Sequence, residues 1–150
     1  IEDIDDLLAS KDDYRNGLIE IDDMSGFMVN NAVYDAINMN TFNFINATFD
    51  NMFLRFPTGT EFLAGYNMVE NNTSGQLLGQ SGQNKEEYIA ILTSSREFYQ
   101  GLVMWRYQQL MARDPDTEEL VVHVTEIFLT HDFQYLQREV MKTDEYAQFD

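Results

Sequence analysis

The chain has 150 residues, of which 44% are hydrophobic and 13% aromatic, so it is long enough to bury a core and does not have the composition of a disordered polypeptide. It carries 26 acidic and 9 basic side chains, and the resulting net charge of −17 argues against nucleic acid as a partner. The absence of cysteine excludes disulfides, thiolate zinc sites and cysteine nucleophiles. No stretch approaches the roughly 20 apolar residues of a transmembrane helix, so we expect no direct membrane span.

The spacing of apolar residues and the positions of capping residues predict an all-α fold. Phe42, Ile45, Phe49 and Met52, for example, follow one another at helical intervals. The expected helices cover residues 2–9, 11–19, 26–39, 42–55, 59–70, 84–93, 95–112, 117–129, 132–142 and 143–149. No run of residues alternates convincingly between apolar and polar, so we expect no β-sheet.

The second half of the chain repeats a pattern found in the first half. Residues 49–63 align with residues 107–121 at an offset of 58, and the two prolines of the chain, Pro57 and Pro115, occupy the same place in the two copies. The downstream match has an offset of 48, which indicates an insertion in the first copy. We therefore predict one all-helical domain with an N-terminal helical extension at 1–41, a first repeat unit at 42–98 with an insertion at 71–82, and a second repeat unit at 99–150.

The recurring residues have a structural explanation. They are Arg55, Pro57, Thr58 and Glu61 in the first copy and Arg113, Pro115, Asp116 and Glu119 in the second. Thr or Asp three residues before Glu is typical of a capping box, and a proline just before it ends the previous helix. Each arginine is expected either to interact with the C-terminal dipole of the preceding helix or to pair with the following glutamate. We interpret these residues as structural.

The repeated pattern resembles two known families. It is similar to the linker-polypeptide domain of cyanobacterial phycobilisomes and to a short helical repeat of unknown function found in bacterial extracellular proteins. The residues that carry the likeness are Phe49, Met52, Arg55, Pro57, Glu61, Ser95, Glu97 and Phe98 in the first copy and Tyr107, Leu110, Arg113, Pro115, Glu119, Thr143, Glu145 and Tyr146 in the second. The glycine that usually precedes the arginine is replaced by Leu54 and Ala112 here.

The resemblance implies a function and a location. It points to a helical structural or adaptor subunit without catalysis, which docks onto other proteins in a larger assembly or at the cell surface. It also favours a bacterial periplasmic or extracellular location over the cytoplasm. The acidic composition predicts that a protein partner would present a basic surface.

Three groups of residues are candidates for partner binding. Acidic residues crowd the first 23 positions, where Asp5, Asp6, Asp22 and Asp23 either form a solvated face or bind a basic partner. Leu77 and Leu78 lie in the glycine-rich insertion and are expected either to enter the core or to contact a partner. Trp105 lies on an aromatic-rich helix and has the same two alternatives.

No catalytic motif is present, so we expect no catalytic residue, metal site or cofactor. His123 and His131 are eight residues apart, too far for a shared metal on one helix. The alternative function is a small-molecule or divalent-ion (calcium) binding module, or a hydrolase that uses two of the many carboxylates.

Overall fold

The computed structural model describes residues 2–148, and this part of the chain is predominantly helical, which confirms the all-α fold class. The chain forms two compact units, Ile1–Ser95 and Arg96–Asp150. No helix of the described residues is long and apolar enough to cross a membrane.

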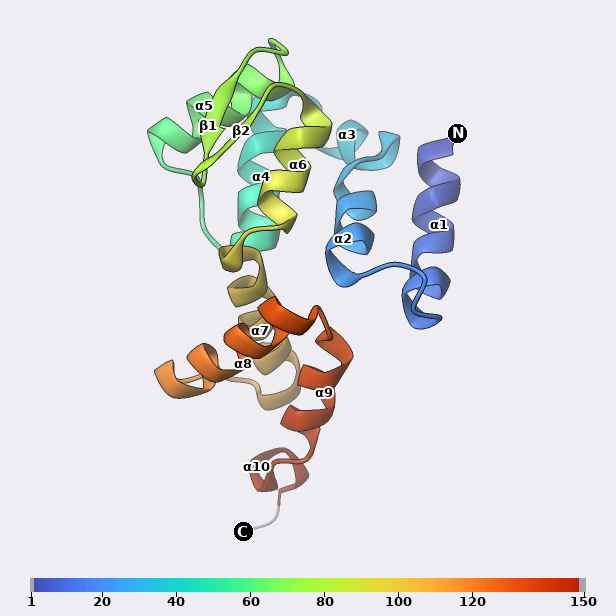
Figure 1. The fold of residues 1–150 in the computed structure, drawn as a ribbon, viewed down its shortest axis with the longest axis vertical. Helices are drawn as coiled ribbons and strands as arrows, with labels where there is room; N and C mark the ends of the chain where they lie inside the picture. The colour runs from blue at the N-terminus through green and yellow to red at the C-terminus, as the bar shows by residue number, and fades with distance from the viewer. Residues whose placement is uncertain (1, 149–150) are drawn as a thin grey trace. The chain divides into compact units, whose positions relative to one another are not determined.

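The first unit contains six helices and a β-hairpin within its described residues (Figure 1). Its elements are α1 (Glu2–Arg15), α2 (Ile21–Val29), α3 (Ala32–Asn38), α4 (Thr41–Phe53), α5 (Gly59–Val69), β1 (Gly75–Leu77), β2 (Gln80–Gly82) and α6 (Lys85–Thr93). The second unit contains α7 (Arg96–Met111), α8 (Thr117–Thr130), α9 (Phe133–Met141) and α10 (Asp144–Ala147).

The N-terminal helices differ from the expected ones. The prediction of separate helices at 2–9 and 11–19 was wrong, because Ser10 stays within α1, where its hydroxyl donates to the carbonyl oxygen of Leu7 at 2.7 Å. The single helix expected at 26–39 is divided into α2 and α3 at Asn31, whose side-chain oxygen accepts from the backbone N–H of Tyr34 at 2.9 Å. An asparagine cap competes well with helix continuation, and this cap starts a new helix.

The insertion corrects the prediction that no sheet would form. Its two strands pair antiparallel, with Gly75 opposite Gly82 and Leu77 opposite Gln80. The turn between them places Leu78 and Gly79 at φ values of 51° and 78°, as a tight two-residue hairpin turn requires. Leu77 is buried in the core of the first unit, whereas Leu78 is half-buried.

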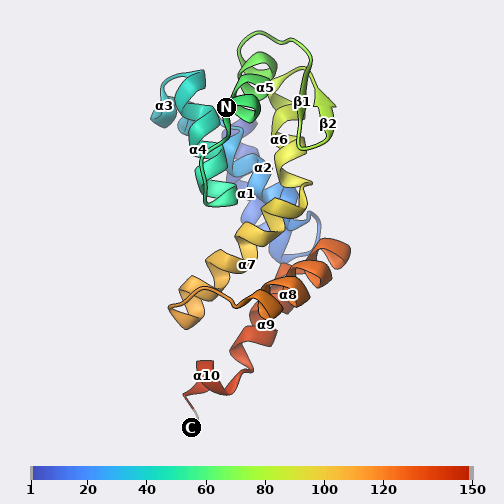
Figure 2. The same cartoon turned by 90° about the vertical axis from the view of Figure 1, so that its left-hand side faces the viewer.

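The core of the first unit is organised around Tyr88 on α6. The Tyr88 ring is fully buried, and its hydroxyl lies 2.7 Å from the buried hydroxyl of Thr48 on α4. Burial raises the pKa of Tyr88 well above its usual range. Gly65 on α5 makes room for this ring, since a Cβ there would lie 2.8 Å from Tyr88 Cε2. Helices α4, α5 and α6 therefore pack closely, with the hairpin lying against α5 (Figures 1 and 2).

The core of the second unit is formed by side chains of α7, α8 and α9. Its buried residues are Phe98, Tyr99, Val103, Tyr107, Val124, Ile127, Phe133, Leu136 and Val140. Trp105 is only partly covered: it is 42% exposed, and its ring stacks on Phe133 with centroids 6.3 Å apart. The guanidinium of Arg106 lies 4.8 Å from the Trp105 ring.

Candidate functional site: the arginine turns and the outer face of α8

The first arginine turn connects α4 to α5. Leu54 follows the last residue of α4 in the left-handed conformation, at φ 56°, and turns the chain so that Arg55 faces Glu61. Two guanidinium nitrogens of Arg55 donate to the two carboxylate oxygens of Glu61, at 2.9 and 2.8 Å. The same carboxylate accepts from the backbone N–H of Thr58 at 2.8 Å, and the Thr58 hydroxyl accepts from the backbone N–H of Glu61 at 3.3 Å. These are the hydrogen bonds of a capping box.

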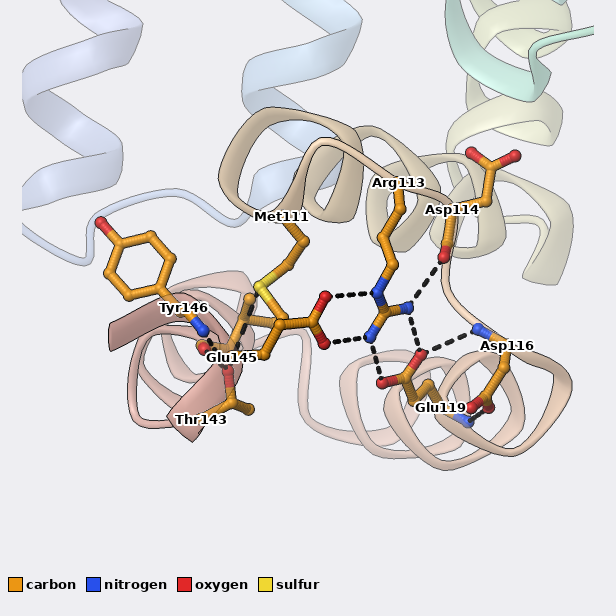
Figure 3. Close-up of polar contacts among 9 residues, drawn as sticks. Met111, Arg113, Asp114, Asp116, Glu119, Thr143, Glu145 and Tyr146 are labelled. Carbon is orange, nitrogen blue, oxygen red and sulfur yellow. Dashed lines mark hydrogen bonds and ion pairs between the residues drawn. The ribbon is translucent and has the colours of Figure 1, made fainter. Parts of the chain in front are cut away.

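The second arginine turn, between α7 and α8, has the same hydrogen bonds. Ala112 is left-handed at φ 54°, and Arg113 donates to both oxygens of Glu119 at 2.8 and 2.9 Å. The backbone N–H of Asp116 donates to Glu119 at 2.8 Å, and the Asp116 carboxylate accepts from the backbone N–H of Glu119 at 2.9 Å. Arg113 also donates to both oxygens of Glu145 on α10, at 2.7 and 2.8 Å (Figure 3). The guanidinium thus holds α10 against the turn.

The charged groups of the turns are fixed in their ionised forms. Hydrogen bonds from Arg55 lower the pKa of Glu61 to about 2, and hydrogen bonds from Arg113 lower the pKa of Glu119 to about 2, in each case against the opposing effect of burial. Burial and the charge of Glu119 raise the pKa of Tyr107, whose ring lies under Arg113, to about 12. Both carboxylates therefore stay charged, and paired with their arginines, at a lower pH than an ordinary glutamate would.

Helix α8 carries apolar side chains on the side turned away from its core. Val124 and Ile127 are buried, whereas Val121, Val122 and Leu129 are 57%, 54% and 75% exposed. Helical spacing places Val122 and Leu129 on the side opposite the buried pair, with Val121 at the edge of this exposed face. We define the outer face of α8 as Glu118, Val121, Val122, Thr125 and Leu129, all of which are exposed.

A hollow of about 230 Å³ lies at the N-terminal end of this face. It is lined by Asp116, Glu118, Glu119, Val122 and His123. Two of its three carboxylates are used in the turn, but that of Glu118 makes no hydrogen bond or ion pair with any described residue. Nδ1 of His123 is enclosed and has no hydrogen-bond partner within residues 2–148. The hollow is therefore acidic and has one carboxylate available.

The other predicted partner-binding residues do not form one site. Asp5 and Asp6 are exposed on α1, and Asp22 and Asp23 lie in the first turn of α2. Asp23 has a local role, because its carboxylate accepts from the backbone N–H of Glu20 at 3.0 Å. Leu77 belongs to the core of the first unit, whereas Trp105 belongs to the second unit.

The outer face of α8 was missed by the sequence analysis. A signal was present, because residues 120–129 contain more apolar positions than one buried face of a helix can hold: Leu120, Val121, Val122, Val124, Ile127, Phe128 and Leu129.

Comparisons of the chain with known protein families, with curated proteins and with solved structures found no match.

Proposed function

We propose that this chain is a non-catalytic adaptor subunit that docks onto other proteins in a larger assembly or at the cell surface. The observation that carries the proposal is the outer face of α8, where Val122 and Leu129 are exposed on the side opposite the core and Val121 is exposed at the edge of the same face. Single exposed apolar residues are ordinary, but several on one helix face are typical of a surface that another protein covers.

A second apolar surface in the first unit supports the proposal. It follows α3 into the start of α4, where Val33, Ile37, Met39 and Phe42 are 49%, 71%, 82% and 59% exposed. None of the residues of α3 is buried, although most of them are apolar. A short helix with this composition gains little from its own core, and a partner would supply the missing contacts.

The recurring charged residues support a structural role for the motif. Arg55, Glu61, Arg113 and Glu119 are held in bidentate pairs at the turns, and Glu61 and Glu119 also cap helices. Their hydrogen-bonding groups are directed at the protein's own backbone and side chains. Binding then falls to the exposed apolar faces and to the carboxylates around them.

The experiment uses the absence of natural cysteine. Variants Leu129→Cys and Ile37→Cys each place one thiol on a proposed surface, and Ala9→Cys places one on an exposed part of α1 as a control. Each purified variant is labelled with a photo-crosslinker, returned to an extract of its native source and irradiated, and the products are identified by mass spectrometry. We expect discrete products from Leu129→Cys or Ile37→Cys that Ala9→Cys does not give.

Sedimentation of the unlabelled chain at micromolar concentration tests for self-association in parallel. The adaptor proposal is rejected if both surface variants give the same diffuse products as the control and the chain sediments as a monomer.

A further inference from the structure

The outer face of α8 has the spacing of a helix-docking surface. Glu118, Val122, Thr125 and Leu129 follow one another at intervals of four, three and four residues, which is the spacing of a seam between two packed helices. The seam runs for roughly 16 Å along the helix, or about three turns. Val121 widens it on one side. A second helix packed along α8 would present its own side chains at the same intervals of three and four residues, so the two rows could interdigitate.

The corresponding helix of the first unit shows what a cover does at this position. At an offset of 58 residues, Ala64 and Met68 of α5 correspond to Val122 and Glu126 of α8. The hairpin covers α5 there: a Cβ added at Gly75 would lie 2.9 Å from the carbonyl oxygen of Ala64 and 3.1 Å from Met68 Cε. Ala64 is 7% exposed and Met68 is fully buried, whereas Val122 is 54% exposed. The second copy has no such insertion, and Val122 is left open where Ala64 is covered.

The charges around the outer face of α8 indicate the kind of partner that would bind there. Asp114, Asp116 and Glu118 are exposed at the N-terminal end of the outer face, and no lysine or arginine occurs between Arg113 and Arg138. Arg96 of α7 lies at one edge, where it donates to Thr125 at 2.9 Å, and Glu126 lies beyond the other edge by helical spacing. A second copy of the chain, with a net charge of −17, would bring carboxylates against carboxylates. A basic helix complements this surface.

The hollow could bind a basic side chain of the partner. Its wall includes the unpaired carboxylate of Glu118 and the methyl groups of Val122, so it offers both an acceptor and an apolar contact. A lysine or arginine stem packs on apolar surface while its charged end reaches a carboxylate. The next turns of the same helix would place apolar residues on Val122 and Leu129.

We propose that the outer face of α8 binds a basic amphipathic helix of a partner protein, with one lysine or arginine of that helix in the hollow beside Glu118. This inference rests on the proposed adaptor function and names the chemistry of its partner. At Val122 the helix would cover the position that the hairpin covers at Ala64 in the first unit.

The test uses three fluorescent peptides of about 18 residues, long enough to cover the seam. The first has leucine at the heptad seam positions and lysine at the others, with alanine as filler. The second replaces every lysine by glutamate. The third has the composition of the first in an order that scatters the leucines around the helix. Binding to the full chain is measured by fluorescence anisotropy, and amide chemical-shift changes locate the site.

Two variants of the chain test the two parts of the site. The double variant Val122→Ser/Leu129→Ser removes the apolar contact, and Leu8→Ser, at a residue 72% exposed on α1, is its control. Glu118→Gln removes the unpaired carboxylate. Its control is Glu86→Gln, because Glu86 is exposed and holds the same second position of its helix, α6. All five replaced side chains are exposed enough for the folds to be retained, which circular dichroism checks.

We expect the basic amphipathic peptide to bind, and the acidic and scattered peptides to bind at least about tenfold more weakly. The double variant should weaken binding about tenfold and Glu118→Gln about threefold, with little change in either control. Shift changes should centre on residues 118–129. The inference is overturned if the basic peptide does not bind at about 1 mM, if charge reversal has no effect, or if Leu8→Ser weakens binding as much as the double variant. Such a failure combined with specific crosslinks in native extract would leave the adaptor function standing with a different partner chemistry.

Discussion

Helices α5 and α8 begin in the same way and end in different surroundings. Each follows a left-handed residue, an arginine paired to a glutamate by two hydrogen bonds, a proline and a reciprocal cap. Beyond the first turn the likeness stops. In α5 the buried residues are Ala64, Gly65 and Met68, whereas in α8 they are Val124 and Ile127, which lie on a different face when the helices are aligned.

This difference between α5 and α8 separates two causes: the arginine turn determines how each helix begins, and the elements packed against the helix determine which of its faces is buried. The arginine, the proline and the cap act over six or seven residues and make the same turn twice. Which face of the following helix is buried depends on the elements packed against it, namely the hairpin and Tyr88 for α5. The division into two repeat units stays a prediction, since the turns are alike but the surroundings of the helices that follow them are not.

The largest expected effect is at the covered position. Met68→Ala removes a fully buried side chain beneath the hairpin and should reduce the free energy of unfolding by about 3 kcal/mol, because it leaves a cavity as well as losing buried area. The matched change Glu126→Ala, at the aligned position of α8, should alter it by less than about 1 kcal/mol, because Glu126 is only half-buried and leaves no enclosed cavity. Urea unfolding followed by circular dichroism measures both.

Equal losses in the two variants would break the comparison between a covered and an open helix. A small loss at Met68 would show that the hairpin does not close tightly over α5.

The parts that the sequence predicted are those determined by local interactions. Thr58 with Glu61 and Asp116 with Glu119 lie three residues apart, so the pattern of residues contains the cap. The hairpin escaped prediction because its strands have only three residues each and its left-handed turn uses Leu78, a residue that disfavours this conformation. The outer face of α8 escaped because burial is a tertiary property.

The N-terminal region shows the same limit. Asn31 is an ordinary cap, but nothing in its sequence neighbourhood distinguishes it from the other asparagines of 30–40, so one helix was predicted where two form. Proline marks both arginine turns and is absent from residues 1–56. The two prolines therefore made the helix boundaries at the arginine turns predictable, whereas the N-terminal region offers no such marker.

Acidification should weaken both turns. The pKa of Glu61 and of Glu119 is about 2 in the folded chain against an ordinary value of 4.5, so their contribution is present above about pH 4.5 and is lost as the pH falls toward 2. Glu61→Gln and Glu119→Gln should each cost about 1–2 kcal/mol at pH 7 after allowance for solvent screening of these partly exposed pairs. Urea midpoints between pH 7 and pH 3 measure the effect.

Acidification also relieves repulsion among the remaining carboxylates, and it does so in the unaltered chain and in the double variant Glu61→Gln/Glu119→Gln alike. Comparing the two therefore isolates the loss of the two ion pairs. The stability of the double variant should change less on acidification than that of the unaltered chain. Parallel pH profiles would mean that the two ion pairs do not contribute to stability as their geometry suggests.

The two caps should have similar strengths. Thr58→Ala and Asp116→Ala each leave the backbone N–H of the glutamate three residues later without its side-chain acceptor, and each should cost about 1 kcal/mol. Asp116 adds a negative charge near the N-terminus of α8, so its replacement should cost slightly more at low salt. If one variant loses about 2 kcal/mol and the other nothing, the two turns are not equivalent in energy despite their common hydrogen bonds.

The smallest expected change is a gain. Ala112 is left-handed at φ 54°, a conformation in which a Cβ is unfavourable and glycine is not, so Ala112→Gly should raise the free energy of unfolding by about 0.5–1 kcal/mol. Leu54→Gly removes the same strain but also a side chain that is only 38% exposed, so its gain should be smaller. Ala90→Gly, at an exposed position inside α6, is the control and should cost about 1 kcal/mol, since glycine disfavours a regular helix. Opposite signs for Ala112→Gly and Ala90→Gly in urea unfolding would show that the residue before each arginine is selected by backbone conformation.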